Sequence, residues 1–463
     1  MNSFVDILYI IAFGLFIYGL MGLTGPRTAV RGNMIAAVGM VIAIIAALLT
    51  PGMSNWLLIA LGIVLGAVVG VPSARQVKMT AMPQMVALFN GVGGGAVGLI
   101  AWVEFRSTND YLHQAAYVPV TSLFAAIIGS ISFWGSLVAF GKLQEILPGR
   151  PISLGKSQQA VNLLLLVLAV VCAVVAGVGV NSQWLIVGVL IFAAALGLMV
   201  VLPIGGADMP VVISLLNAFT GLSAAATGLA LDNTAMIVAG MIVGASGTIL
   251  TNLMATAMNR SIPAIIAGGF GGGGAVAGAE GAGEHAGTVR STNAADAAIQ
   301  LAYASHVVVV PGYGMAVAQA QHAVREMAKL LEDKGVEVKY AIHPVAGRMP
   351  GHMNVLLAEA DVPYEQLKEM DDINGEFSRT DVALVIGAND VTNPAARNNP
   401  SSPIHGMPIL NVDEAQSIIV LKRSMNPGFA GIENELYYDP KTAMLFGDAK
   451  SSVNSVTEEL KAL

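Results

Sequence analysis

The sequence is short of cysteine and of charge, and both shortages narrow what the chain can be. Cys172 is the only thiol, so no intramolecular disulfide can form and no cysteine cluster can hold a metal ion. Charged residues make up 11% of the 463 residues, and no basic stretch of the kind that binds nucleic acid occurs. We therefore expect neither a metal centre nor a nucleic-acid partner.

Charge is scarcest in the first part of the chain. Residues 1–264 hold nine Lys or Arg and six Asp or Glu, whereas residues 265–463 hold fourteen and twenty-four. The N-terminal stretch has neither the positive charge nor the cleavage pattern of a secretory signal, so we expect a retained first helix. The composition predicts an apolar part followed by an acidic part with the character of a soluble domain.

Nine apolar runs in the first part are long enough to cross a membrane as helices, because about 20 residues span the hydrocarbon layer. We expect these spans near residues 4–24, 34–50, 55–73, 83–103, 118–140, 160–180, 184–203, 209–231 and 234–257. Eight of the nine basic residues in this part fall in loops on one side of such a bundle, and Arg106 alone falls on the other. The excess of positive charge on one side predicts an N-terminus outside and a C-terminal domain in the cytoplasm.

Few polar side chains interrupt the spans. Asn90, Ser136, Asp208, Asn217 and Asn252 stand out, and groups of this kind usually face a protein interior or a water path because their burial in lipid is costly. Asp208 could equally be a simple helix N-cap, and Asn90 and Asn217 could be hydrogen-bonding groups between helices. The predicted spans contain no histidine, the side chain that titrates most readily near neutral pH.

The remainder of the chain divides into a linker and an α/β domain. Residues 265–290 are rich in Ala and Gly, which is typical of a flexible linker between domains at 1–264 and 291–463. Strands are predicted at 306–310, 336–342, 382–387, 408–412, 417–421 and 443–446, and helices at 291–304, 315–334 and 449–463. Alternating strands and helices predict an open parallel sheet with both faces covered, as in a Rossmann-like domain.

One of three glycine patterns has the context of a nucleotide site. The pattern Gly-x-Gly-x-x-Gly/Ala/Val at 91–96 lies within a span, and that at 269–274 lies in the linker. The third, formed by Gly312, Gly314 and Val317, directly follows a Val-rich strand and precedes a helix. The first glycine permits the turn, the second lets the backbone approach phosphate, and the helix start supplies N–H groups. We therefore expect a dinucleotide here.

The strand ends indicate which dinucleotide. An NAD site usually has an acid at the end of its second strand, but here that strand ends at Ile342 and His343. Lys422, Arg423 and Ser424 follow a later strand and form a suitable set of donors for the 2′-phosphate of NADP. A solvated basic pair is the alternative reading of these three residues.

Longer runs of the sequence resemble the beta subunit of the proton-translocating (Re/Si-specific) NAD(P) transhydrogenase. They are residues 204–212, 257–261, 311–320, 343–360, 386–391, 422–426 and 445–450. The resemblance implies hydride transfer from NADH on a partner alpha subunit to NADP⁺ on this chain, coupled to inward proton translocation and yielding NADPH. It implies a dimer of alpha–beta assemblies in the bacterial inner membrane, and a Rossmann-like domain that holds its nucleotide in reversed orientation.

The same resemblance implies the site residues. The NADP(H) contacts fall in the strand-end loops, at Gly312, Tyr313, Gly314 and Val317; at Val345, Ala346, Gly347, Arg348, Met349 and Pro350; at Gly387, Ala388, Asn389, Asp390 and Val391; at Lys422, Arg423 and Ser424; and at Gly447, Asp448, Ala449 and Lys450. Asp390 matches a conformationally sensitive acid, and Ser136, Asp208 and Asn217 match polar membrane residues. Asn90 stands where some members carry a histidine, which leaves the proton donor unassigned.

Two other functions remain open at this point. An ion transporter or channel with an NADP-sensing domain would also have nine spans and a nucleotide site. A reductase tethered to a membrane would have the nucleotide site, but it leaves the polar residues in the spans unexplained.

Overall fold

The computed structural model describes residues 2–23, 26–77, 81–108, 115–148, 152–180, 182–205, 208–258, 261–268, 289–347, 351–400, 402, 404–428 and 431–463. The chain forms two compact units, one of Met1–Thr251 with Ile265–Phe270 and one of Asn252–Ala264 with Gly271–Leu463. The short helix α10 (Ile262–Gly268) reaches into the predicted linker, and residues 269–288 lie outside the described residues. The boundaries at 264 and 290 therefore stay a prediction.

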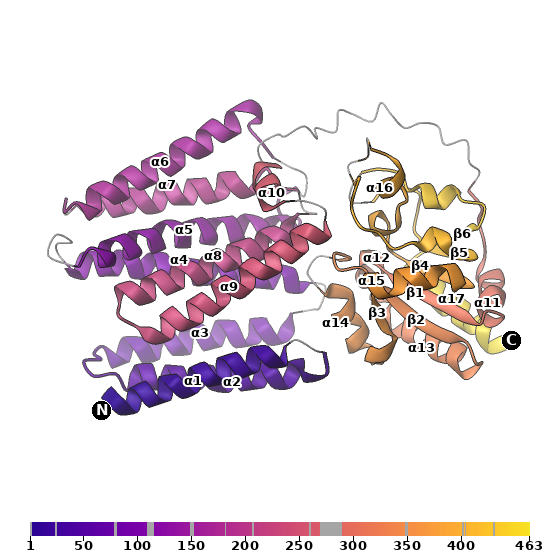
Figure 1. Cartoon of the computed structure of the whole chain (residues 1–463), viewed down its shortest axis with the longest axis horizontal. Coiled ribbons are helices and arrows are strands. Elements are labelled where there is room, and N and C mark those ends of the chain that lie inside the picture. Colours follow the sequence, from indigo (N-terminus) through magenta and orange to yellow (C-terminus); the bar gives the residue numbers. More distant parts are fainter. Residues whose placement is uncertain are drawn as a thin grey trace. The chain divides into compact units, whose positions relative to one another are not determined.

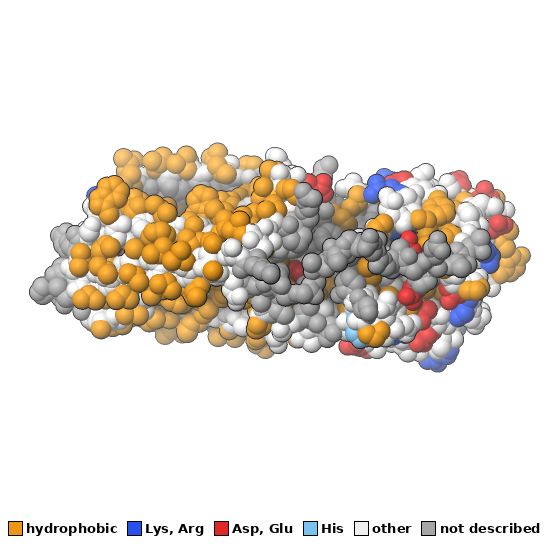
Figure 2. Space-filling view, turned by 90° about the horizontal axis from the view of Figure 1, so that it is seen from above, with side chains coloured by type: hydrophobic (Ala, Val, Ile, Leu, Met, Phe, Trp, Pro, Cys, Tyr) orange, Lys and Arg blue, Asp and Glu red, His pale blue; other side chains and the backbone are white. Residues whose placement is uncertain are grey.

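Within the described residues, nine helices are long and apolar enough to cross a membrane, which confirms the expected spans. They are α1 (Asn2–Gly22), α2 (Pro26–Leu48), α3 (Trp56–Gln76), α4 (Met82–Thr108), α5 (Tyr117–Leu143), α6 (Gln158–Gly177), α7 (Gln183–Val201), α8 (Met209–Ala230) and α9 (Thr234–Ala257) (Figure 1). Exposed hydrophobic side chains gather on the face of this unit that Figure 2 shows, as contact with the hydrocarbon layer requires.

The centre of the helical unit is formed by α5 and α8. Each buries 56% of its most apolar stretch, whereas α3 buries none. Glycine lets neighbouring helices approach closely, because a Cβ on Gly94 of α4 would lie 2.9 Å from the carbonyl oxygen of Gly129 on α5. Helix α8 also packs against both α4 and α5, so polar groups on these three helices are held together inside the bundle.

The second unit contains a six-stranded parallel sheet in the order β3-β2-β1-β4-β5-β6. The strands are β1 (His306–Pro311), β2 (Glu337–Ile342), β3 (Leu367–Glu369), β4 (Val382–Ile386), β5 (Ser417–Lys422) and β6 (Thr442–Phe446). The order reverses between β1 and β4. In open sheets of this kind, ligands bind outside the carboxyl ends of the strands at that switch point.

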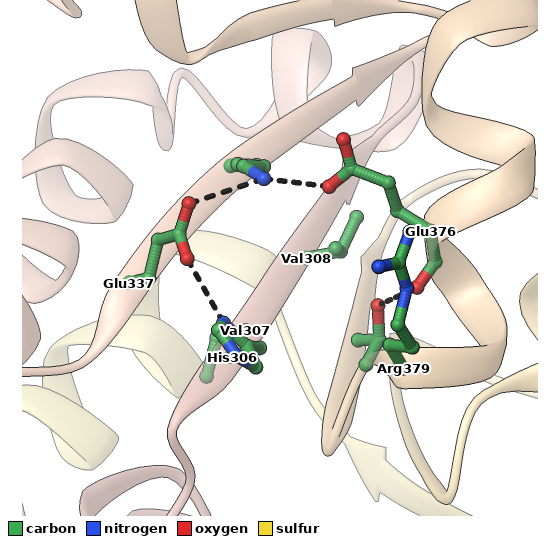
Figure 3. Close-up of a pocket in the computed structure, with 8 residues that line it drawn as sticks. His306, Val307, Val308, Glu337, Glu376 and Arg379 are labelled. Atoms are coloured by element: carbon green, nitrogen blue, oxygen red, sulfur yellow. Dashed lines mark hydrogen bonds and ion pairs between the residues drawn. The ribbon is translucent and has the colours of Figure 1, made fainter.

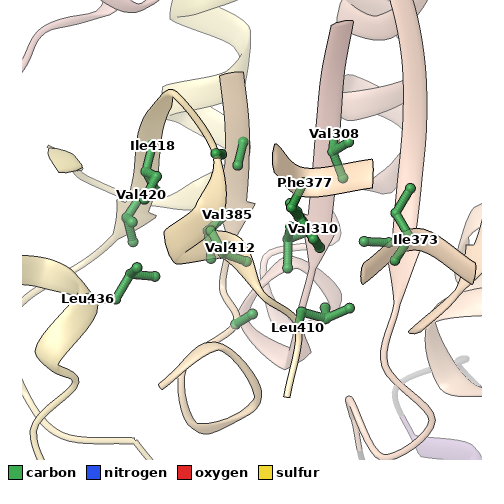
Figure 4. Packing of buried hydrophobic residues seen from close by; sticks show 14 of the residues in the cluster. Val308, Val310, Ile373, Phe377, Val385, Leu410, Val412, Ile418, Val420 and Leu436 are labelled. Carbon is green, nitrogen blue, oxygen red and sulfur yellow. The ribbon is translucent and has the colours of Figure 1, made fainter. Parts of the chain in front are cut away.

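Helices and short helical turns cover both faces of the sheet. They are α11 (Ala294–Ala302), α12 (Tyr313–Val317), α13 (Gln321–Asp333), α14 (His352–Glu359), α15 (Met370–Ile373), α16 (Ala395–Asn398), α17 (Ala449–Ala462) and the 3₁₀ turns η4 (Tyr364–Gln366), η5 (Asn374–Arg379), η6 (Asp390–Thr392), η7 (Val412–Glu414) and η8 (Glu435–Tyr438). A further 3₁₀ turn, η3 (Gly155–Ser157), belongs to the helical unit. The side chains of Asn293 and Asp448 cap α11 and α17 as N-cap acceptors. Figure 4 shows the core on one face, where β1, β4 and β5 pack against η5, η7 and η8.

The strand predicted at 408–412 is wrong. Leu410 and Val412 are buried in this core, but the segment pairs with a loop, since Leu410 N donates to Val391 O at 2.9 Å. The Asn374 side chain satisfies its backbone by donating to Ile409 O and accepting from the N–H of Asn411. The outer position of the sheet beside β2 belongs instead to β3.

The helix predicted at 315–334 is also wrong as a single element. It is divided into α12 and α13 by a turn in which Gln319 has φ 49°. A non-glycine residue in the left-handed region cannot lie inside a regular helix.

Candidate functional site

The turn after β1 and the loop after β4 cross in close contact at the switch point. Gly312 N donates to Ile386 O at 2.9 Å, and Gly314 N donates to Gly387 O at 3.0 Å. A Cβ on Gly314 would lie 2.8 Å from Gly387 Cα, and Gly387 itself has φ +69°. Only glycine fits these two positions. The crossing therefore presents backbone without side chains at the carboxyl ends of β1 and β4.

The other predicted loops lie at the same end of the sheet, because the carboxyl ends of parallel strands lie together. Residues 345–347 follow β2, 387–391 follow β4, 422–424 end β5, and 447–450 follow β6. Gly447 N donates to Lys422 O at 3.1 Å, which joins the last two loops. Residues 348–350 lie outside the described residues, so the place of Arg348 stays a prediction. The fold thus brings the described residues of the predicted NADP(H) site together at the carboxyl ends of the strands.

Lys422 points into the loop cluster, whereas Arg423 and Ser424 are exposed. The Lys422 ammonium donates to Asn426 O at 2.6 Å and lies 4.9 Å from the ring centroid of Tyr437. Burial lowers the pKa of Lys422, and the negative charge of Asp390 opposes this shift. Asp390 begins η6 and is close enough to act on this charge. Lys422 therefore lies near the negative charge of Asp390, whereas the exposed Arg423 is accessible to a ligand.

Asn389 lies at the centre of a side-chain network. Its amide satisfies its surroundings best with the nitrogen donating to Tyr437 Oη at 2.8 Å and the oxygen accepting from Lys422 Nζ at 3.3 Å and from Gly428 N at 2.6 Å. Asn434 Nδ2 donates to the Asn389 carbonyl at 3.0 Å. Tyr437 and Asn434 could not be predicted from the sequence, since they come from a segment without a recognisable motif.

His343 holds the start of the loop after β2. Its Nδ1 accepts from Val345 N at 3.2 Å, and its Nε2 donates to Pro408 O at 2.8 Å. Only the neutral Nε2-protonated ring satisfies both contacts. Burial lowers the pKa of His343 to about 4, although the bond to Pro408 opposes the shift. The residue at the place of the usual NAD-binding acid is therefore an uncharged imidazole.

His352 packs beneath the same loop. A Cβ on Gly347, whose φ is +114°, would lie 2.6 Å from His352 Cβ. The ring of His352 is fully buried and lies 6.3 Å from that of Tyr313. His352 therefore packs against the loop after β2 and lies near Tyr313 in the turn after β1.

Comparison with known proteins identifies the family. A family model described as NAD(P) transhydrogenase beta subunit matches residues 5–459. The chain belongs to this family. A curated relative from Rhodospirillum rubrum, NAD(P) transhydrogenase subunit beta, is 49% identical over 459 residues, which cover 98% of each chain; the same figures hold for the protein from strain ATCC 11170 of that species. This membership favours the transhydrogenase over the transporter and the tethered reductase.

In this beta-subunit fold the structure brings together some of the polar membrane residues. Asn90 on α4 donates to Ser136 Oγ at 2.9 Å and to Ser132 Oγ at 3.3 Å, both on α5. Ser132 also bonds to Thr220 Oγ1 and to the Leu216 carbonyl of α8. Ser132 and Thr220 could not be predicted from the sequence, because serine and threonine are common in helices.

Asp208 and Asn217 do not join that cluster of four side chains. Asp208 occupies the N-cap position of α8 without a side-chain bond to the first turn, and Asn217 is half-buried further along α8. The N-cap interpretation of Asp208 therefore holds for its position only, and the transport role of both residues stays a prediction.

A pocket of about 250 Å³ lies at the opposite end of the sheet, at the amino ends of β1 and β2 (Figure 3). Lys339 bridges Glu337 and Glu376 at 3.1 and 2.6 Å, and His306 lies 3.0 Å from Glu337. These charges already pair with one another, and nucleotide sites in such sheets lie at the carboxyl ends. The pocket is therefore separate from the candidate site.

Proposed function

We propose that the C-terminal unit binds NADP(H) at the β1–β4 switch point and that the chain works with an alpha subunit that binds NAD(H). The observation that carries this proposal is the contact of Gly314 with Gly387, which brings the turn after β1 and the loop after β4 together at the carboxyl ends of the strands, where β5 ends at Lys422 and Arg423 follows. Backbone N–H groups and an exposed Arg423 suit a pyrophosphate and a 2′-phosphate. The partner is inferred from the name of the relatives, which are beta subunits.

The neutral His343 supports NADP over NAD. A carboxylate at the end of β2 would accept from the ribose hydroxyls of NAD. An uncharged imidazole, fixed by two hydrogen bonds, does not, and the 2′-phosphate set that we propose lies beyond β5, on the other side of the switch point. Lys422, Arg423 and Ser424 remain our proposed 2′-phosphate set, and Arg348 remains a proposed NADP(H) contact.

The reaction needs little chemistry from the protein. A hydride, carrying two electrons, passes from the reduced nicotinamide of NADH to the oxidised nicotinamide of NADP⁺, so no side-chain nucleophile is required. The protein contributes proximity and orientation. Because both rings are nicotinamides, the transfer is nearly balanced without an added driving force.

Proton movement supplies that driving force in our proposal. One proton moving inward across 100 mV releases about 2.3 kcal/mol, which corresponds to roughly a fiftyfold shift toward NADPH. Coupling then acts through the relative affinities for NADP⁺ and NADPH. We assign the nucleotide end of this coupling to Asp390 beside Lys422, and the membrane end to Asn90, Ser136, Asp208 and Asn217. From the basic loops we infer that the C-terminal unit lies in the cytoplasm, and we expect alpha–beta assemblies to pair as dimers.

The test uses the full-length chain with its alpha subunit in vesicles whose C-terminal units face outward. Reduction of an NAD⁺ analogue by NADPH should acidify the lumen, since this reverse reaction drives protons the opposite way. Asp390→Asn should change NADPH release and its pH dependence. Hydride transfer that leaves the lumen pH unchanged in sealed vesicles would contradict the coupling.

A further inference from the structure

We propose that Tyr437 is a positioning residue for the NADP(H) site, holding the Asn389 side chain through its hydroxyl and the Lys422 ammonium against its ring. The inference rests on the proposed function, because it assumes that the loops after β4 and β5 bind the nucleotide. Tyr437 itself belongs to neither loop, and it comes from η8 in a later part of the chain.

The geometry joins two neighbouring strand ends through one side chain. Tyr437 Oη lies 2.8 Å from the Asn389 amide, in the loop directly before Asp390. The centroid of its ring lies 4.9 Å from Lys422 Nζ, at the end of β5. An ammonium near the face of an aromatic ring is attracted by the ring quadrupole. A displacement of Tyr437 would therefore be felt in both loops at once.

Tyr437 is itself firmly placed. It is 2% exposed within the core of the sheet unit, and its neighbour Leu436 belongs to the same core. Asn434 accepts from Leu436 N at 3.0 Å and donates to the Asn389 carbonyl at 3.0 Å, so one residue fixes η8 to the β4 loop. The packing of the core therefore fixes the position of Tyr437, and Asn434 ties η8 to the loop after β4.

The hydroxyl acts as a hydrogen-bonding group and not as an acid. Burial raises the pKa of Tyr437, and the nearby charge of Asp390 raises it further, while the hydrogen bond to Asn434 opposes the shift. The phenol thus stays protonated over the physiological range. Its contribution is the direction it imposes on Asn389, and through Asn389 the place of Lys422.

The experiment compares Tyr437→Phe with wild type in the full-length chain, by calorimetric titration with NADP⁺ and NADPH. Phenylalanine keeps the ring under Lys422 and removes the hydroxyl, and with it the 2.8 Å bond to Asn389 and the weaker contacts of that hydroxyl with Asn434 and with the Ala388 carbonyl at 3.5 Å. A neutral hydrogen bond typically contributes enough for a threefold to tenfold change in a dissociation constant, so we expect NADP⁺ to bind about threefold to tenfold more weakly. Tyr438→Phe is the matched control, because its hydroxyl bonds to Glu433 at 3.3 Å at the surface.

A second comparison separates positioning from core packing. If Tyr437 acts through Asn389, the double variant Tyr437→Phe/Asn389→Ala should bind NADP⁺ no more weakly than Asn389→Ala alone. A purely structural role predicts lower thermal stability with unchanged affinity, or effects of the two changes that multiply. Either result, in a chain whose wild type binds NADP⁺, overturns the inference alone; a wild type that does not bind NADP⁺ overturns the proposed function and the inference with it.

Discussion

Asn90 Nδ2 donates to Ser136 Oγ at 2.9 Å and so joins α4 to α5 inside the helical unit. The same amide nitrogen contacts Ser132, which continues to Thr220 and to the Leu216 carbonyl on α8. Asn90 is 8% exposed, and its Oδ1 accepts no hydrogen bond from any residue the structure describes. One asparagine thus organises hydroxyls from two other helices and keeps an acceptor available.

Asn90→Ala should lower proton-coupled transhydrogenation and leave NADP⁺ binding unchanged. The change removes the donor to two buried serine hydroxyls, and a buried polar group without its partner costs about 1–3 kcal/mol. The measurement is lumen acidification per hydride transferred in vesicles. Asn252→Ala is the matched control, because Asn252 is exposed near the C-terminal end of α9. Equal proton coupling in both variants would exclude Asn90 from the proton path.

Gly314→Ala should weaken NADP⁺ binding at least tenfold. The added Cβ would lie 2.8 Å from Gly387 Cα, closer than real Cβ contacts, so the β1 turn and the β4 loop must separate. Gly375→Ala serves as the control, since a Cβ at that position meets nothing within 4 Å. Titration calorimetry on the full-length chain measures both. If Gly314→Ala binds NADP⁺ as wild type does, the crossing does not carry the phosphates.

His343 should make the stability of the sheet unit depend on pH. The unfolded chain takes up a proton near pH 6.5, whereas the folded chain does so only near pH 4. Between these values the unfolded state binds more protons, so the free energy of unfolding falls as the pH falls. The whole shift corresponds to about 3 kcal/mol.

His343→Gln removes this titration, and the variant should lose less stability than wild type between pH 6.5 and 4.5. Urea unfolding of the full-length chain, followed by circular dichroism, measures the transition of the sheet unit. The exposed His322→Gln controls for the loss of an imidazole. Parallel pH dependence in wild type and His343→Gln would show that the buried ring is not the source.

Arg423→Ala should weaken NADP⁺ binding about tenfold or more and reduce its salt dependence, because hydrogen bonds between charged groups contribute roughly 1.5–3 kcal/mol. The effect on adenosine 2′,5′-bisphosphate should be as large as that on NADP⁺. Adenosine 5′-phosphate, which lacks the 2′-phosphate, should respond little. Arg379→Ala is the control, since Arg379 is an exposed arginine at the amino ends of the strands, away from the proposed site.

The sequence predicted the nine spans and the glycine turn because both are local. A span is a run of apolar residues, and the turn is a glycine pattern between a strand and a helix. The strand at 408–412 was predicted wrongly because an apolar run shows that side chains are buried, but not how the backbone pairs. The Asn374 side chain completes that backbone from 35 residues away. At three residues, β3 is too short to give a pattern.

The networks around the site could not be predicted in the same way. Thr220 bonds to the Leu216 carbonyl of its own helix, so its sequence context matches that of any helical threonine. His343 was noted only as the absence of an acid, and its two hydrogen bonds require the folded positions of Val345 and Pro408. Tyr437 contacts Asn389 across 48 residues of sequence. Such contacts depend on tertiary structure, which motifs do not encode.

The most direct test of this account is titration calorimetry of the full-length chain with NADP⁺, NADPH and NAD⁺ at one ionic strength. We predict saturable binding of NADP⁺ and NADPH, and binding of NAD⁺ at least about 100-fold weaker, since roughly two charged contacts to the 2′-phosphate are lost. Equal affinity for NAD⁺ and NADP⁺, or no binding of either NADP form, would contradict the assignment of the β1–β4 switch point.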